Sequence, residues 1–167
     1  MFASLIIVTT AYIKIPAPLG YVHIGDSVIY LSSSVLPGPF SFLSAAVGGA
    51  LADLLAGYPQ WMPATAIIKS LNVLPFFLVR LFLNGKTKSE RIINTPNVLM
   101  LIPTASVTLG GYFIANMLMY GAGAAVAELL PNLLQATASS AVFILLGLSL
   151  DSVNFKKRIL SVKENNK

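Results

Sequence analysis

Long apolar stretches, separated by short segments rich in proline, glycine or polar residues, dominate the chain. A helix needs about 20 apolar residues to cross the hydrocarbon core of a bilayer. The last four stretches are long enough to span unaided, whereas the first two must tilt, begin inside the membrane or pack against longer neighbours. The runs are continuously apolar rather than alternating, which favours helices over a β-barrel. The pattern predicts one all-α membrane domain of six transmembrane helices, at about residues 1–13, 25–36, 39–57, 63–83, 97–120 and 130–150.

Proline and glycine mark the breaks between these stretches. Residues 15–20 contain two prolines, which remove backbone donors and restrict the preceding residues. Residues 36–39 have the composition of a tight turn, and residues 57–63 end the third helix and place Pro63 at the start of the fourth. The one long hydrophilic loop is expected at residues 84–97.

Composition supports a membrane protein and excludes several other classes. Hydrophobic residues make up 56% of the 167 residues and charged residues only 10%, against about 25% charged in soluble domains. The absence of cysteine rules out disulfides and thiolate chemistry. A single histidine, His23, is too little for a histidine-rich metal site. We therefore expect no metal and no bound cofactor.

The basic residues fix the expected orientation. Most of them lie in the loop after the fourth helix or in the tail at residues 151–167, so the positive-inside rule makes that side cytoplasmic. With six helices, both termini are then cytoplasmic. The outer loops are expected at residues 14–24, 58–62 and 121–129, and the net charge of +5 reflects topology rather than nucleic-acid binding. These basic residues are Arg80, Lys86, Lys88, Arg91, Lys156, Lys157, Arg158, Lys163 and Lys167.

A few polar residues stand within the apolar stretches and need a reason to be there. Lys69 lies six residues into the fourth predicted helix. It either faces an anionic or hydrogen-bond-accepting ligand or forms an ion pair with Asp53 or Asp26. For Asp26, at the start of the second helix, a helix N-cap is the expected role. His23 is expected to position its loop rather than to act as a general base.

Other polar residues share helix faces near the outer end. Asn132 and Gln135 are three residues apart, and Tyr112 and Asn116 are four apart. These faces either line one pocket or form interhelical hydrogen bonds. Aromatic walls with a few polar groups are typical of ligand pockets. The candidate ligand-binding residues are therefore Tyr58, Trp61, Lys69, Tyr112, Asn116, Glu128, Asn132 and Gln135.

The third predicted helix contains two pairs of small residues spaced by four. Ala45 with Gly49, and Gly48 with Ala52, allow another backbone to approach closely. We expect this face to pack within the chain, with a partner protein as the alternative. Gly48 and Gly49 lie inside a helix without a following Gly-Lys-Ser/Thr, so they do not form a nucleotide-binding loop.

Several segments together resemble the substrate-binding S components of energy-coupling factor (ECF) vitamin transporters. The resemblance covers nearly the whole chain in the same order, and the branch for hydroxymethylpyrimidine or pyridoxine-type vitamin B6 compounds is the most similar. It rests on Ile15–Asp26, Gly48–Tyr58, Pro63–Thr65, Ile68–Lys69, Gly110–Tyr112, Glu128 and Pro131–Gln135.

The resemblance implies a six-helix subunit of a prokaryotic cell membrane that binds a vitamin with high affinity. It implies a pocket between the outer loops and helices four to six, and docking on a transmembrane coupling subunit with two cytoplasmic ATPases. ATP would be used by those partners, and toppling of the S component would release the ligand inside.

One feature departs from the family pattern. Family members carry an Ala-xxx-Ala pair on the first helix, but here Ala3 is followed four positions later by Ile7. We expect the native chain to begin upstream of Met1 and to supply the missing small residue.

Two other function classes remain as alternatives. A stand-alone secondary transporter of a small heterocyclic metabolite would show inverted repeats, and none is evident. An intramembrane enzyme would need a complete set of catalytic groups around His23, so we do not expect an enzyme.

Overall fold

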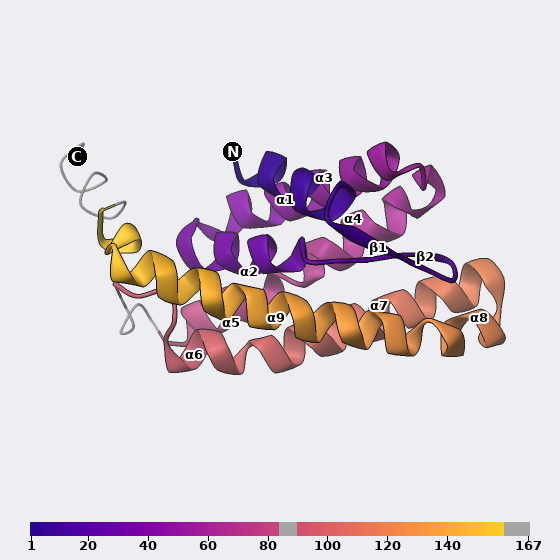
Figure 1. The fold of residues 1–167 in the computed structure, drawn as a ribbon. Helices are drawn as coiled ribbons and strands as arrows, with labels where there is room; N and C mark the ends of the chain where they lie inside the picture. Colours follow the sequence, from indigo (N-terminus) through magenta and orange to yellow (C-terminus); the bar gives the residue numbers. More distant parts are fainter. Residues whose placement is uncertain (84–89, 159–167) are drawn as a thin grey trace.

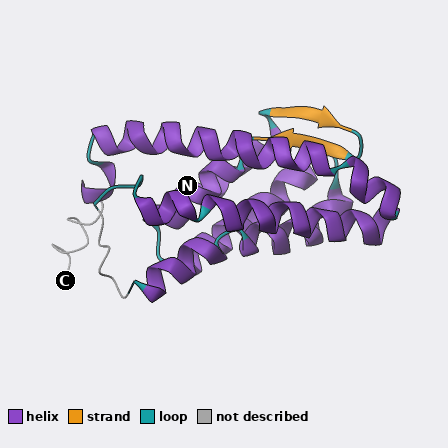
Figure 2. Cartoon of the chain, turned by 90° about the horizontal axis from the view of Figure 1, so that it is seen from below, coloured by secondary structure: helices purple, strands orange, loops and turns teal. Residues whose placement is uncertain are grey.

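The computed structural model describes residues 1–83 and 90–158, which form an elongated helical bundle with one β-hairpin near one end (Figures 1 and 2). The basic residues Lys86, Lys88, Lys163 and Lys167 lie outside the described residues. The elements in chain order are α1 (Phe2–Ala11), β1 (Lys14–Ala17), β2 (Gly20–His23), α2 (Asp26–Val35), α3 (Gly38–Ala56), the 3₁₀ turn η1 (Pro59–Trp61), α4 (Met62–Leu71), α5 (Leu74–Phe82), α6 (Thr95–Leu99), α7 (Leu101–Tyr120), α8 (Ala122–Ala127) and α9 (Leu129–Ser152).

Four helical stretches of the described chain are long and apolar enough to cross a membrane. They are Gly38–Ala56, Pro59–Phe82, Thr95–Tyr120 and Ala122–Ser152. These agree with the four long stretches that the hydrophobic pattern predicts. The helices α1 and α2 have 10 residues each, so their length alone does not make them spans. The count of six transmembrane helices therefore stays a prediction.

The fourth predicted helix, at residues 63–83, is divided into α4 and α5. The division falls just before Pro75, which is near the start of α5. Proline has no N–H to donate to the carbonyl four residues earlier, and its ring crowds that carbonyl. Leu71 is therefore the last residue of α4. Sequence reasoning used the outer prolines as breaks and missed this inner one.

Two expected outer loops contain regular structure. Residues 14–23 form the antiparallel hairpin β1–β2, in which Lys14 pairs with His23 and Ala17 with Gly20. The expectation of an all-α chain was wrong in this segment. Proline suits a short exposed strand, because an edge position needs no donor on its outer side. The expected loop at 121–129 includes the helix α8, whose alanine-rich sequence has high helix propensity.

The short helix α2 lies at the centre of the bundle. Every residue from Asp26 to Ser34 is buried, and α2 contacts α1, α3, α5 and α9. The ring of Tyr30 lies 5.9 Å from the ring of Phe76 and 6.0 Å from that of Phe143, measured between centroids. Protein rather than lipid therefore surrounds α2, which explains how so short a helix fits among longer ones.

The small residues of α3 pack within the chain. A Cβ on Gly48 would lie 2.9 Å from the side chain of Ile6 in α1, and a Cβ on Gly49 would lie 2.9 Å from Lys69 in α4. Ala45 and Ala52 are fully buried. The expectation of internal packing is therefore confirmed, because α1 and α4 approach α3 where it has no side chain.

Candidate ligand-binding site

The hairpin β1–β2 extends along the bundle toward α8 (Figure 1). Its turn is held by Glu128, whose Oε1 accepts a hydrogen bond from the backbone N–H of Leu19 at 2.8 Å. Its second strand is held by Tyr21, whose hydroxyl donates to Oδ1 of Asp53 at 2.7 Å. The hairpin is thus fixed to both α3 and the junction of α8 with α9, and these two contacts form the sides of a pocket.

The pocket lies between the hairpin, α3, α4, α7 and α9. It encloses about 50 Å³ of space, or about 410 Å³ when its opening to solvent is included. Its lining residues are Leu19, Gly20, Tyr21, His23, Asp53, Trp61, Thr65, Tyr112, Asn116, Glu128, Asn132 and Gln135.

Two aromatic side chains form one wall. The ring centroids of Trp61 and Tyr112 are 5.8 Å apart. The hydroxyl of Tyr112 lies 3.3 Å from the hydroxyl of Thr65, within hydrogen-bond distance. Trp61 is also 5.9 Å from the ring of Tyr120. The wall is therefore rigid and offers flat surfaces against which a planar ring can pack.

Three buried polar atoms on the lining residues have no hydrogen-bond partner. They are Nε1 of Trp61, Oδ1 of Asn116 and Oδ2 of Asp53. The other atoms of these groups are used: Nδ2 of Asn116 donates to the carbonyl of Tyr112 at 2.9 Å. A buried polar atom without a partner costs about 1–3 kcal/mol. One donor and two acceptors are thus available to a ligand.

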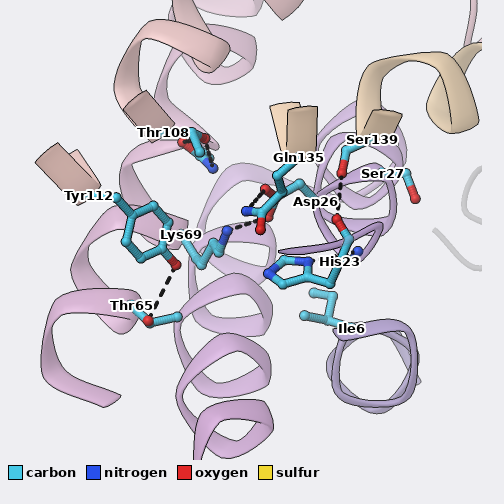
Figure 3. A network of polar contacts seen from close by, with 12 residues as sticks. Ile6, His23, Asp26, Ser27, Thr65, Lys69, Thr108, Tyr112, Gln135 and Ser139 are labelled. Atoms are coloured by element: carbon cyan, nitrogen blue, oxygen red, sulfur yellow. Dashed lines mark hydrogen bonds and ion pairs between the residues drawn. The ribbon is translucent and has the colours of Figure 1, made fainter. Parts of the chain in front are cut away.

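Behind the pocket, Lys69 forms a buried ion pair with Asp26. The Nζ atom lies 2.6 Å from Oδ1 of Asp26, and the side chains are 1% and 0% exposed. The other carboxylate oxygen accepts from Nε2 of Gln135 at 3.0 Å (Figure 3). Of the alternatives for Lys69, the ion pair with Asp26 is therefore present, and the pair with Asp53 is not among the salt bridges of the described residues.

The expectation that Asp26 caps α2 was wrong. Gly25 holds the N-cap position and no side chain caps this helix. The carboxylate of Asp26 turns instead toward α4 and α9, where it balances the charge of Lys69. Charge pairing outweighs capping here, because an unpaired ammonium group in the interior costs far more than an uncapped N–H.

His23 joins the hairpin to α2. Its Nδ1 accepts from the N–H of Gly25 at 3.1 Å, and its carbonyl accepts from Ser139 at 3.4 Å. Burial lowers the pKa of His23 to about 3, and the nearby charge of Lys69 acts in the same direction. The imidazole is therefore neutral. These contacts agree with the expected role in positioning the loop, and Figure 3 shows the ring beside the Lys69–Asp26 pair.

Six of the eight predicted site residues line one pocket: Trp61, Tyr112, Asn116, Glu128, Asn132 and Gln135. The other two do not. Tyr58 packs against Tyr21, with ring centroids 5.3 Å apart. Lys69 lies behind the pocket, with its Nζ 5.0 Å from the ring centroid of Tyr112.

Sequence reasoning missed six lining residues, which are Leu19, Gly20, Tyr21, His23, Asp53 and Thr65. Asp53 lies near the C-terminal end of α3 and Thr65 near the N-terminal end of α4. A four-residue spacing from Thr65 to Lys69 could have indicated a shared face. The pairing of β1 with β2 places Tyr21 at the pocket. The sequence of this hairpin has no alternation of apolar and polar residues that would have predicted strands.

Comparison with known proteins identifies relatives along most of the chain. A protein from Pyrococcus woesei, described as an uncharacterized protein in gap 3'region, is 35% identical over 160 residues, covering 94% of this chain and 98% of that protein. Residues 1–152 match the family described as ECF-type riboflavin transporter, S component. The helical bundle and its apolar spans agree with this match. The chain therefore belongs to the family of ECF-type riboflavin transporter S components.

Proposed function

We propose that this S component captures a small, flat, nitrogen-containing heterocycle, either hydroxymethylpyrimidine or a vitamin B6 compound, in the pocket under the hairpin. Membership of the family makes the chain a membrane-embedded vitamin-binding subunit of an ECF transporter, and this family is not one of enzymes. The proposal adds the ligand and the residues that hold it.

The observation that carries the proposal is the set of free polar atoms beside an aromatic wall. Nε1 of Trp61 and Oδ1 of Asn116 are buried and unpaired, and both residues line the pocket with Tyr112. A ring nitrogen can accept from the indole N–H, and an amino or hydroxyl group can donate to the amide oxygen. Stacking on Tyr112 or Trp61 supplies the apolar contact.

The remaining lining residues have assigned roles in this proposal. Asn132 offers a second amide for the edge of the ring. Gln135 lines the pocket while its Nε2 is held by Asp26, so its orientation is fixed in advance. Glu128 lines the pocket and also holds the hairpin turn.

Riboflavin is the second candidate ligand, because the matched family is described by its riboflavin transporters. The aromatic wall suits an isoalloxazine ring as well as a pyrimidine or pyridine. Because the enclosed space is only about 50 Å³, the hairpin must move outward for any of these ligands, and farther for riboflavin than for the smaller rings. The compact pocket favours the smaller heterocycles.

Transport follows the scheme that the family implies. The chain would lie in a prokaryotic cell membrane with both termini in the cytoplasm and the hairpin outside. It would dock on a transmembrane coupling subunit that carries two ATPases. Arg80 donates to the carbonyls of Ser33 and Leu36 at the C-terminal end of α2, whereas the hairpin leads into the N-terminal end of α2. This placement agrees with a cytoplasmic location of the end that carries Arg80.

The test uses the one tryptophan of the chain. Protein purified in detergent is first extracted and the co-purifying compound identified by mass spectrometry. Hydroxymethylpyrimidine, pyridoxine and riboflavin are then titrated while the emission of Trp61 is recorded. We expect saturable binding of one of the two smaller compounds with a change in emission.

Variants separate the pocket from the scaffold. Asn116→Ala and Asn132→Ala should each weaken binding about tenfold or more, as expected when a polar ligand group loses its partner. Thr137→Ala is the matched control on α9, because Thr137 is exposed and its hydroxyl bonds to carbonyls of its own helix. Unchanged affinity in folded Asn116→Ala and Asn132→Ala would exclude this pocket as the binding site.

A further inference from the structure

Acidic side chains line the pocket, but no cationic side chain of the described residues does. Two carboxylates, Asp53 and Glu128, are among its lining residues, and no lysine or arginine of residues 1–83 and 90–158 lines it. Both carboxylates are buried, at 5% and 7% exposure. Charges so placed are poorly screened by solvent.

The nearest lysines are held outside the lining of the pocket. Lys69 is 1% exposed and is paired with Asp26 at 2.6 Å behind the pocket wall. Lys14 is exposed and donates to the carbonyl of Ala56 at 3.4 Å, with its Nζ 4.9 Å from the ring centroid of Tyr21. Neither ammonium group is among the residues that line the pocket.

The carboxylates are also not saturated by hydrogen bonds. Asp53 uses Oδ1 for the hydroxyl of Tyr21, while its buried Oδ2 has no partner. Glu128 uses Oε1 for the amide of Leu19. The unpaired oxygen of Asp53 is a buried acceptor on a residue that lines the pocket. A ligand with a hydrogen-bond donor or a positive charge would satisfy it.

We infer that the pocket selects ligands by charge: it takes neutral or cationic heterocycles that present hydrogen-bond donors to Asp53 and Glu128, and it rejects their phosphate esters. The inference deepens the proposed function and rests on it. A phosphate group adds about 1.5 to 2 negative charges at neutral pH. Such a group would approach two buried carboxylates with no cation in the lining to offset the repulsion.

The experiment compares each alcohol with its own phosphate ester. Purified protein is titrated with hydroxymethylpyrimidine, pyridoxine and riboflavin and with the phosphate monoester of each, using Trp61 emission and equilibrium dialysis. For every pair in which the alcohol binds, we expect the ester to bind at least about 100-fold more weakly. An ester that binds as tightly as its alcohol overturns the inference.

Charge is separated from size by variants. Asp53→Asn and Glu128→Gln keep the shape and the acceptor oxygens and should each reduce the discrimination to about tenfold. Asn132→Lys adds a cation to the lining and should reduce it further. Glu90→Gln is the matched control, since Glu90 is 59% exposed and pairs with Lys157 outside the pocket. Discrimination that is unchanged in Asp53→Asn, Glu128→Gln and Asn132→Lys alike shows a size effect and overturns the inference.

The compound extracted from the protein distinguishes the two proposals. A neutral or cationic ligand that is neither a pyrimidine nor a B6 compound contradicts the proposed vitamin and supports selection by charge. An anionic co-purifying ligand overturns selection by charge whatever its ring. If no compound of either charge class binds, both proposals fail.

Discussion

The carboxylate of Glu128 accepts the backbone N–H of Leu19 at 2.8 Å, across 109 positions of sequence. This bond joins the turn of the hairpin to the junction of α8 and α9. A hydrogen bond to a charged acceptor is worth about 1.5–3 kcal/mol. Tyr21 and Asp53 hold the second strand, whereas this contact holds the turn, so it fixes the tip of the hairpin beside the pocket.

We predict that Glu128→Ala loosens the hairpin without unfolding the bundle. Loss of about 1.5–3 kcal/mol should raise hydrogen exchange in residues 14–23 by at least tenfold. Exchange measured by mass spectrometry reports this, with peptides from α3 as the internal reference. Glu128→Gln retains the acceptor oxygen and should show a smaller change, whereas equal exchange in all three proteins would contradict the assigned contact.

We predict that Lys69→Met destabilises the fold, because it leaves Asp26 charged and buried without its partner. The expected loss is about 3–5 kcal/mol, measured by thermal unfolding in detergent. Adding Asp26→Asn should restore much of the stability, since the asparagine keeps an oxygen for Gln135 and carries no charge. A double variant no more stable than Lys69→Met would show that the ion pair does not determine this cost.

We predict a pH dependence that belongs to His23. Its pKa is lowered to about 3 by burial and by Lys69, whereas the unfolded value is near 6.5. The unfolded chain thus binds the proton first as pH falls. The contribution of the neutral imidazole is fully present above pH 6.5 and is lost progressively toward pH 3.

Unfolding measured at pH 7 and pH 5 tests this assignment. The wild-type protein should lose about 2 kcal/mol more than His23→Gln over that interval. Carboxylates titrate in both proteins, so their contribution to the loss of stability cancels in the difference. Equal losses of stability in the two proteins would show that the proton binds to a group other than His23.

We predict opposite outcomes for two glycines. A Cβ on Gly48 would lie 2.9 Å from Cβ of Ile6 and 3.1 Å from the carbonyl oxygen of Ala3, whereas a Cβ on Gly110 meets nothing within 4 Å. Gly48→Ala should cost about 1–3 kcal/mol through forced separation of α1 and α3. Gly110→Ala should be neutral or stabilising by up to about 1 kcal/mol. Thermal unfolding of both variants compares them directly.

Much of this architecture could be predicted from the sequence, because membrane spans depend on local hydrophobicity. The four long stretches were found in this way, and six of the twelve pocket-lining residues were found from polar and aromatic positions near the predicted outer end. The break before Pro75 was missed because its neighbours are uniformly apolar. The hairpin was missed because its stability comes from Glu128 and Asp53, which are remote in sequence.

The role of Lys69 shows a second limit of prediction from the sequence. Its position in an apolar stretch indicated a partner, but spacing could not choose between a ligand, Asp53 and Asp26. The choice depends on how α2 sits against α4 and α9. Asp26 satisfies both Lys69 and Gln135, a three-way arrangement that no single helix pattern encodes.

The enclosed position of α2 has a consequence for synthesis in the cell. Its ten residues include three consecutive serines, Ser32, Ser33 and Ser34, whose hydroxyls bond back to carbonyls of Ile29 and Tyr30. Alone, such a segment is too short and too polar to leave the translocon for lipid. We therefore expect α2 to insert into the membrane only together with its flanking helices.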